Sequence, residues 1–156
     1  MPSRRDTIRM SAEEADAYLR SRSRIILVTN GPEGLPHPVP MNYGLDDKGR
    51  IIITSFRRSQ KVRNLERDPR ATLLVESGDG YAELKSVIVY ADVEIITDPE
   101  EIPRLMSHIG ADRELAGSIS GSMSEQVKAS IAKRVVLRFT PRNMVSWDHT
   151  KLQGFY

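Results

Sequence analysis

A long run of alternating apolar residues limits what this chain can fold into. Within residues 81–97, apolar side chains occupy every second position, which is the period of a β-strand with one buried face. They are Val87, Val89, Ala91, Val93 and Ile95. Fully extended, the run would measure about 50 Å, so we expect it to bend or to carry a bulge. A strand this long needs partners, and the sequence therefore predicts a protein built mainly from β-sheet.

Shorter runs rich in β-branched residues provide the partner strands. They span residues 24–29, 36–44, 50–55, 71–76, 134–140 and 144–147, with a turn expected at 141–143. Clusters of Gly, Pro, Asn and Asp separate most of them, as in chains that form antiparallel hairpins. Because closure of a sheet removes its exposed edges, we predict a mainly β fold, a six-stranded antiparallel barrel with a few short flanking helices.

The chain has 156 residues, which suits a single domain over residues 1–156, with a flexible arm at 1–10 and a C-terminal tail at 148–156. It contains no cysteine, which excludes disulfides and thiolate chemistry. No apolar run approaches the roughly 20 residues of a membrane span, and the first residues lead into polar sequence rather than a signal core. We therefore expect a soluble, cytoplasmic protein that does not bind membranes.

Three prolines set one of the strands apart. Pro36, Pro38 and Pro40 alternate along residues 36–44, and proline has no N–H group to donate. One edge of this strand therefore cannot be paired in a sheet, so we expect an edge strand or a bulge. The backbone of residues 39–42 is then free to face a ligand.

The strand at residues 50–55 leads directly into a short helix, which should start at Ser59 and end at Asp68, before Pro69. Free backbone N–H groups and the positive end of the helix meet at this turn, which makes it a candidate phosphate site. The side chains that can converge on it are Thr54, Ser55, Ser59 and Lys61.

The charge of this segment supports the same interpretation. Residues 57–70 carry six basic and two acidic side chains, a net charge of +4, whereas the whole chain is only +2. The basic character is therefore local. The alternative interpretation is an ordinary surface helix with solvated arginines, in which Ser59 is a simple N-cap.

Other chemical signals are scarce. The chain lacks the G-x-G-x-x-G, G-x-x-x-x-G-K-S/T, G-x-S-x-G and H-E-x-x-H motifs, so classical dinucleotide folds, nucleotide hydrolases, serine hydrolases and zinc peptidases are not expected. His37, His108 and His149 lie far apart without cysteine partners, and no metal site is expected. Trp147 either covers a planar ring or packs in a core or interface. No general acid, base or nucleophile stands out, which suits a redox cofactor that carries its own chemistry.

Several strings in this order resemble a known family. They are residues 38–41, 53–55, 59–65 and 67–71, continued by 74–76 and 78–81. Together they are similar to the split-barrel flavin-binding proteins related to pyridoxamine 5′-phosphate oxidase, and most similar to the actinobacterial flavin/deazaflavin oxidoreductases that use coenzyme F420. The likeness extends over about residues 12–148. The C-terminal tail departs from the Arg- and His-bearing end of the true pyridoxamine phosphate oxidases, so vitamin B6 oxidation is not expected.

The resemblance implies a six-stranded split β-barrel that pairs as a homodimer, with two cofactor sites in the grooves between subunits. The cofactor-binding residues that it implies are Val39, Pro40, Met41, Thr54, Ser55, Ser59, Gln60, Lys61 and Trp147. The cofactor would be F420, with FMN as the alternative. The reaction implied is hydride transfer between F420 and a small unsaturated or quinone-like molecule, and no side chain is assigned as catalytic.

Three alternatives stay open. The protein could be an FMN-dependent oxidoreductase of the same family. It could also be a non-catalytic carrier or sensor of the cofactor, because no catalytic side chain is identifiable. A nucleic-acid binder is suggested by the pI near 9.0 and the arginines of residues 57–70, but the aromatic content of 6% and the net charge of +2 argue against a nucleic-acid partner.

Overall fold

The computed structural model describes residues 3–110 and 125–154. In that part of the chain, seven strands form one antiparallel sheet in the order β2-β1-β5-β6-β7-β4-β3. The strands are β1 (Arg24–Asn30), β2 (Pro36–Asn42), β3 (Gly44–Leu45), β4 (Ile51–Phe56), β5 (Arg70–Ser77), β6 (Lys85–Ile96) and β7 (Arg134–Asp148). Six of them are long and β3 has only two residues, so the predicted mainly β split barrel is confirmed.

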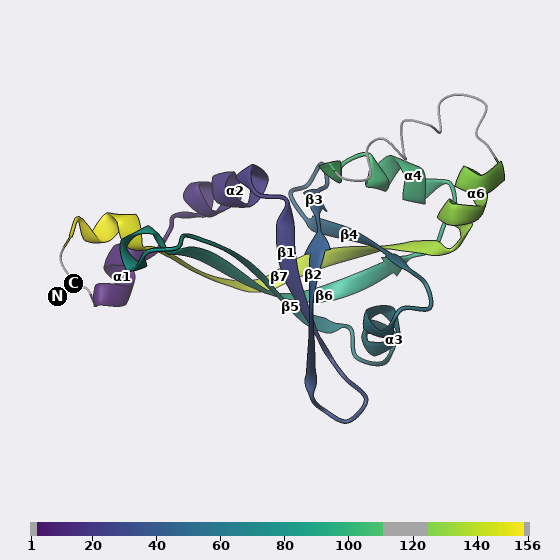
Figure 1. Cartoon of the computed structure of the whole chain (residues 1–156), viewed down its shortest axis with the longest axis horizontal. Helices are drawn as coiled ribbons and strands as arrows, with labels where there is room; N and C mark the ends of the chain where they lie inside the picture. The colour runs from purple at the N-terminus through teal and green to yellow at the C-terminus, as the bar shows by residue number, and fades with distance from the viewer. Residues whose placement is uncertain (1–2, 111–124, 155–156) are drawn as a thin grey trace.

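Short helices flank the sheet (Figure 1). They are α1 (Arg4–Ile8), α2 (Ala12–Ser21), α3 (Gln60–Arg67), α4 (Glu101–Met106) and α6 (Glu125–Ala132), with 3-10 turns η1 (Tyr81–Glu83) and η4 (His149–Leu152). The helix expected after residues 50–55 is α3, and its caps are Ser59 and Asp68 as predicted. None of the helices described is long and apolar enough to cross a lipid bilayer.

The prolines of β2 have the effect predicted from the sequence. β2 pairs with β1 along one edge only, with Pro38 opposite Val28. β2 also lies beside β4, but the two strands do not pair. We call this unpaired junction between β2 and β4 the seam of the barrel.

The end of the chain differs from the prediction. The expected strands at 134–140 and 144–147 are one continuous strand, β7, and the expected turn at 141–143 is wrong. β6 and β7 change register after Tyr90, where Arg142 becomes an extra residue between Pro141 and Asn143. A bulge accommodates a proline that cannot donate to the ladder, so the chain needs no reversal there. The long run at 81–97 therefore has the expected irregularity in its pairing, after Tyr90, but the extra residue belongs to β7 and not to the run itself.

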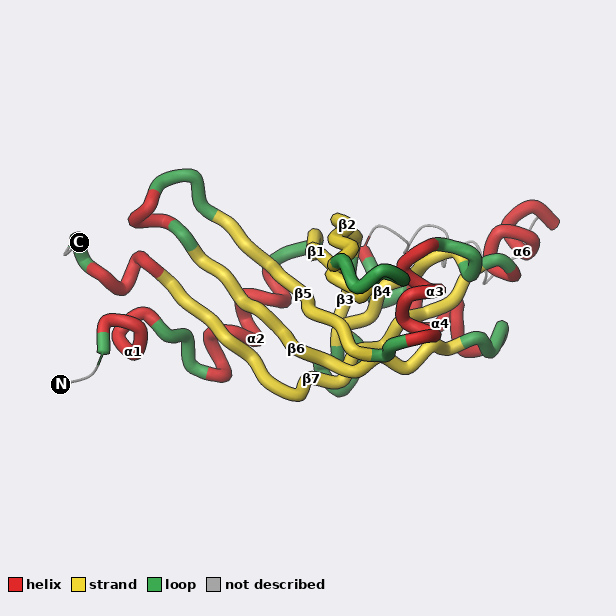
Figure 2. The backbone as a smooth tube through the Cα atoms, turned by 90° about the horizontal axis from the view of Figure 1, so that it is seen from below, coloured by secondary structure: helices red, strands yellow, loops and turns green. Residues whose placement is uncertain are grey.

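Three of the strands extend beyond the rest of the sheet. β5, β6 and β7 run side by side toward the two chain ends (Figure 2). We call this extension, residues 75–77, 85–87 and 146–148, the arm. α1 and η4 lie next to each other at its end, where a flexible N-terminal segment and a tail were expected. Lys151 joins the two, because its ammonium group donates to the Arg9 carbonyl at 2.8 Å.

The apolar core has two parts. The main cluster takes the inward-facing residues of the strands, such as Leu27, Leu73 and Leu137, and helices α2 and α3 cover it with Leu19 and Leu65. A second cluster joins outward-facing residues of β4, β6 and β7 to α4 and α6. Its members are Ile52, Ile96, Ile102, Leu105, Met106, Ile109, Ile131 and Val136. Because Val62 of α3 is also fully buried in the main cluster, the position of α3 is fixed by the core itself.

The close approach of β3 to the end of α4 gives a test of this packing. A Cβ added to Gly44 would lie 2.1 Å from the carbonyl oxygen of His108. We expect Gly44→Ala to lower the free energy of unfolding by about 1–3 kcal/mol, because backbone has to move. Urea unfolding followed by circular dichroism measures this. Gly110→Ala is the control, since nothing lies within 4 Å of its Cβ position, and an equal loss in both variants would contradict the packing described.

Candidate cofactor site

The turn between β4 and α3 brings hydroxyl and ammonium groups together. The Oγ of Ser55 lies 2.9 Å from the Oγ of Ser59, and the Nζ of Lys61 donates to Ser55 Oγ at 3.2 Å. Thr54 and Ser55 are buried, whereas Ser59 and Lys61 are half-buried. We call Ser55, Ser59 and Lys61 the cradle. Ser55, Ser59 and Lys61 thus lie together, at the start of a helix whose backbone N–H groups point out of its first turn. Thr54 precedes Ser55 on β4, where side chains alternate between the Ile52 and Ile53 faces, so its hydroxyl is on the other face of the strand.

Ser59 does not cap α3 with its side chain. Its backbone occupies the N-cap position in an extended conformation, but its hydroxyl is bonded to Ser55 instead of to an N–H group of the helix. The ordinary serine cap of the alternative interpretation is therefore absent. N–H groups at a helix start that lack a side-chain cap suit a bound anion.

Lys61 adds an uncompensated charge to the cradle. Burial lowers the pKa of its ammonium group from the ordinary 10.5, and burial is the only cause of the shift. Among the described residues, no carboxylate forms an ion pair with it. A half-buried cation of this kind is stabilised by an anion brought in from outside.

Asn64 connects α3 to β1. Its side chain is fully buried, and its Nδ2 donates to Thr29 Oγ1 at 2.9 Å. Its Oδ1 accepts hydrogen bonds from Gln60 at 2.8 Å and from Arg67 at 3.3 Å. The Gln60 side chain therefore turns along the helix toward Asn64 and not toward the cradle hydroxyls. Neither Asn64 nor Thr29 was predicted from the sequence, although an Asn next to Leu65, on a basic helix, was a usable signal.

The other cofactor residues expected from the resemblance lie on β2. Val39 and Met41 are half-buried and pack against the main core, so they offer a ligand mainly their backbone. Pro40 is exposed. In the described part of the chain, no strand pairs with the outer edge of β2, and β4 lies beside that edge. The backbone of residues 39–41 therefore borders the seam, and the strand across the seam is β4, which ends in the cradle.

Trp147 lies far from the cradle within the chain. It stands opposite Ser86 in the arm, whereas Thr54 and Ser55 pair with Val136 and Val135 at the other end of β7. Trp147 is eleven positions after Val136 on β7, which is about 35 Å of extended strand. The structure therefore brings the cradle together but does not bring Trp147 to it within one chain.

A pocket of about 520 Å³ lies at the turn between β4 and α3, directly after Ser55 in the chain, although no cradle residue is among its lining. It is lined by Phe56, Arg57, Arg58, Ala132 and Lys133, and we call it the basic pocket. The Arg57 N–H donates to the Lys133 carbonyl at 2.8 Å, which holds the two turns of the pocket together. In the described part of the chain, these three cations have no acidic ion-pair partner. The pocket is therefore a second place beside the cradle where negative charge would be favourable.

Arg134 adds a further positive charge next to the basic pocket. Its guanidinium carbon lies 4.6 Å from the centroid of the Phe56 ring, a cation–π geometry. Among the residues that the structure describes, none forms a hydrogen bond with the buried Nε of Arg134.

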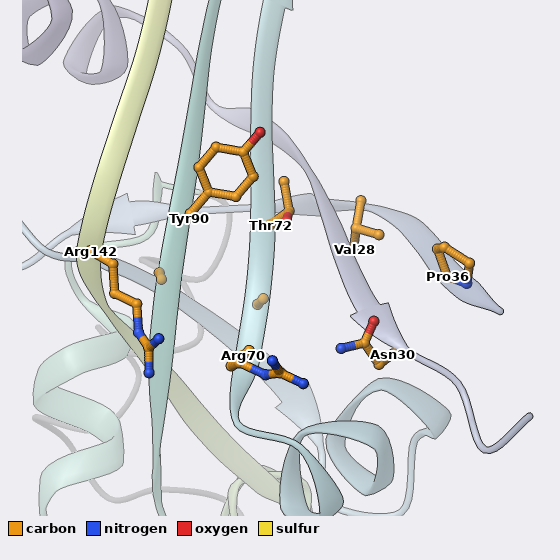
Figure 3. A pocket seen from close by; sticks show the side chains of 9 residues that line it. Val28, Asn30, Pro36, Arg70, Thr72, Tyr90 and Arg142 are labelled. Carbon is orange, nitrogen blue, oxygen red and sulfur yellow. The ribbon is translucent and has the colours of Figure 1, made fainter. Parts of the chain in front are cut away.

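A different pocket, of about 370 Å³, lies on the outward face of the sheet (Figure 3). Val28, Thr72 and Tyr90 stand in a row across its floor. Its two arginines are already neutralised, because Arg70 pairs with Asp68 and Arg142 pairs with Asp92. Its lining comes from β1, β2, β5, β6 and β7 and not from the turn between β4 and α3, so we do not assign it to the cofactor.

The histidines do not form a site together. His149 Nδ1, in η4, lies 2.7 Å from the Tyr81 carbonyl of η1, and His108 lies 3.8 Å from Asp47. His37 is half-buried on β2, and its buried Nδ1 has no hydrogen-bond partner among the described residues. Within residues 3–110 and 125–154, no three His, Asp or Glu side chains come close enough to hold a metal ion.

The lowered pKa of Lys61 predicts a pH dependence of stability. The folded state binds this proton less tightly than the unfolded chain, so the charged ammonium group costs stability at pH 7. The cost fades as pH rises through the lowered pKa toward 10.5. We expect Lys61→Met to unfold at higher urea concentration than the natural protein at pH 7, with a difference that shrinks by pH 10.5. Lys48→Met, at an exposed lysine, is the control. A difference that grows with pH would contradict the assignment.

Comparison with known proteins identifies the family. The family model described as pyridoxamine 5′-phosphate oxidase matches residues 11–148. The solved structure of Rv2991, a conserved hypothetical protein from Mycobacterium tuberculosis, is 32% identical and covers 99% of this chain and 95% of its own, with a TM-score of 0.80. A solved F420 reductase is 24% identical over 83% of this chain and 94% of its own, with a TM-score of 0.59, which shows a shared fold.

The match to a curated relative covers a shorter part of the chain. The 5a,11a-dehydrotetracycline/5a,11a-dehydrooxytetracycline reductase of Streptomyces rimosus subsp. rimosus is 37% identical over 62 residues, which are 38% of this chain and 44% of the reductase. This match therefore spans less than half of that relative. The family model covers most of the chain and Rv2991 nearly all of it, and the family expected from the sequence is confirmed: the chain belongs to the pyridoxamine 5′-phosphate oxidase family.

Proposed function

We propose that the protein is an F420-dependent reductase, which transfers a hydride between F420 and a small unsaturated or quinone-like molecule. The observation that carries the proposal is the cradle with the basic pocket beside it. The cradle suits the ribityl phosphate that F420 and FMN share, because two hydroxyls, one ammonium group and uncapped N–H groups converge there. The basic pocket suits negative charge beyond that phosphate. Beyond its phosphate, F420 carries a chain with carboxylate groups, whereas FMN ends at the phosphate.

The contribution of the chain is to hold and orient the cofactor. F420, when bound, supplies the hydride-transfer chemistry. Ser55, Ser59 and Lys61 would hold its phosphate, and the β2 backbone at residues 39–41 would lie along its ring. Asn64 keeps the start of α3 in position through its bond to Thr29. No described side chain in the cradle is placed as an acid or base, so orientation and exclusion of water are the roles left to the protein.

The second part of the proposal is a homodimer. The sheet positions opposite one another in register, Ile26, Leu74, Ile88 and Val145, form an apolar row on the outward face, and all four are only half-buried. Tyr90 on the same face is 42% exposed. A second copy of the chain would cover this row. It would also explain how Trp147, far from the cradle of its own chain, could reach a cofactor: through the cradle of the partner.

Two features support the remaining parts of the proposal. The Streptomyces relative is a reductase of dehydrotetracyclines by its name, which agrees with an unsaturated substrate. The absence of cysteine fits a cytoplasmic protein. An FMN-dependent enzyme and a non-catalytic carrier are the alternatives that experiment must separate.

Titration with F420 and with FMN tests the cofactor assignment. Quenching of cofactor fluorescence should show F420 binding with a dissociation constant below roughly 100 μM and tighter than FMN, as charge-assisted contacts predict. Lys61→Ala should weaken both cofactors by about tenfold or more, because it removes a charged hydrogen-bond donor. The double variant Arg57→Ala/Arg58→Ala should weaken F420 but leave FMN nearly unchanged.

Arg63→Ala is the matched control, an exposed arginine of α3 that lines neither the cradle nor the basic pocket. Tighter binding of FMN would favour the FMN-dependent alternative, and unchanged binding in Lys61→Ala would remove the cradle from the cofactor site. Oxidation of reduced F420 by quinones or enones then separates an enzyme from a carrier, since a carrier shows no substrate-dependent turnover.

The homodimer has its own test. Light scattering on the purified protein should give twice the chain mass of 17.6 kDa. Ile88→Lys should give the single-chain mass, because it places a charge in the middle of the apolar row. Glu13→Lys, at an exposed position of α2 away from that face, should remain dimeric. A natural protein that is strictly monomeric contradicts this part of the proposal.

A further inference from the structure

A pocket of about 550 Å³ lies between the first two helices and β7. Its lining includes Arg5, Arg9, Met10, Ala12, Met144 and Val145, and we call it the N-terminal pocket. β4 pairs with β7 only as far as Phe139, so in the described part of the chain the following stretch of β7 has a strand on one side only. The segment that joins α1 to α2 covers this stretch incompletely, and the pocket is the space that remains.

The walls of the N-terminal pocket are held in place by polar contacts. The backbone N–H of Met10 donates to Ser146 Oγ at 3.2 Å, which ties the linker to β7. Ser11 and Glu14 form a capping box at the start of α2. Lys151 donates to the Arg9 carbonyl at 2.8 Å and to Glu14 at 2.6 Å. The pocket is therefore preformed, and its volume is in the range of small-molecule sites.

The lining combines an apolar surface with positive charge. Met10, Ala12, Met144 and Val145 contribute apolar area, and methionine side chains adapt readily to the shape of a ligand. Arg5 and Arg9 are exposed at the same pocket. Asp6 pairs with Arg9 at 3.0 Å, whereas Arg5 forms no ion pair in the described part of the chain. These three groups together leave one net positive charge beside the apolar surface.

This pocket is separate from the cradle. Its β7 residues, such as Val145, lie beyond the bulge at Arg142, whereas the cradle strand β4 pairs with β7 before it. We propose that the N-terminal pocket is a second ligand site of this protein, which binds a small organic acid with an aromatic or aliphatic body. The arginines would bind the carboxylate, and the methionine-lined surface would bind the body.

A pair of matched probes tests the charge requirement. The full-length protein is titrated with 1-naphthylacetate and with 1-naphthylacetamide, which has the same shape without the charge, by isothermal calorimetry. The acid should bind about fivefold more tightly than the amide, as expected for exposed charge contacts. In Arg5→Gln/Arg9→Gln the preference for the acid should disappear. In Met144→Trp, which fills the pocket, both probes should lose binding.

Controls separate this site from the cofactor site. Arg4→Gln changes an arginine of the same helix that does not line the pocket, and it should retain the preference for the acid. Each variant is checked for its circular dichroism spectrum and for F420 binding, because the stretch of β7 that lines this pocket leads into Trp147, which the proposed homodimer would bring to the partner's cradle. A loss of probe binding with F420 binding retained supports a second site, whereas a joint loss of both would assign the pocket to the partner's cofactor site and overturn the proposal.

The proposal is also overturned if neither probe binds up to 10 mM, if the amide binds as tightly as the acid, or if the double variant keeps the preference. None of these three outcomes depends on F420 being the cofactor.

Discussion

The buried hydrogen bond between Asn64 and Thr29 is the interaction on which the candidate site depends. It is formed between two fully or almost fully buried polar side chains, one on α3 and one on β1. A bond of this kind is costly to break, because either partner would be left unsatisfied in the core. Together with the burial of Val62 and Leu65, it holds α3 in one position against the barrel. The helix start, and with it the cradle, is therefore positioned by the core and not by the surface loop that precedes it.

The cradle illustrates a general conflict between binding and stability. A half-buried ammonium group without a counter-ion destabilises the free protein, and an incoming anion removes that penalty. Ser59 shows the same compromise, since its hydroxyl is bonded to Ser55 and leaves helix N–H groups uncapped. Both features lower the stability of the isolated chain and both favour a ligand with a phosphate group. Their occurrence in one turn is more informative than either alone.

The sequence predicted those parts of the fold that depend on local chemistry. The prolines of β2 determined an edge strand, and Ser59 and Asp68 marked the ends of α3, because each acts through its own backbone groups. The turn at residues 141–143 was wrong for a physical reason: a proline and an asparagine are also compatible with a bulge, and only pairing with β6 decides between the two. The role of Asn64 was missed, because its buried partner Thr29 lies 35 residues away in the chain. The separation of Trp147 from the cradle was also missed. It follows from the length of β7, which the sequence had led us to expect as two short strands joined by a turn.

The continuity of β7 has a consequence for how such proteins can diversify. One end of this strand is paired with β4 beside the cradle, and the other end carries Trp147 and Asp148 in the arm. A matched insertion of two residues in each of β5, β6 and β7 within the arm would displace the tip by about 7 Å while keeping every side chain on its own face. The strand thus behaves as a spacer of adjustable length. Evolution could alter the reach of the tip in such steps without touching the anion-binding turn at its other end.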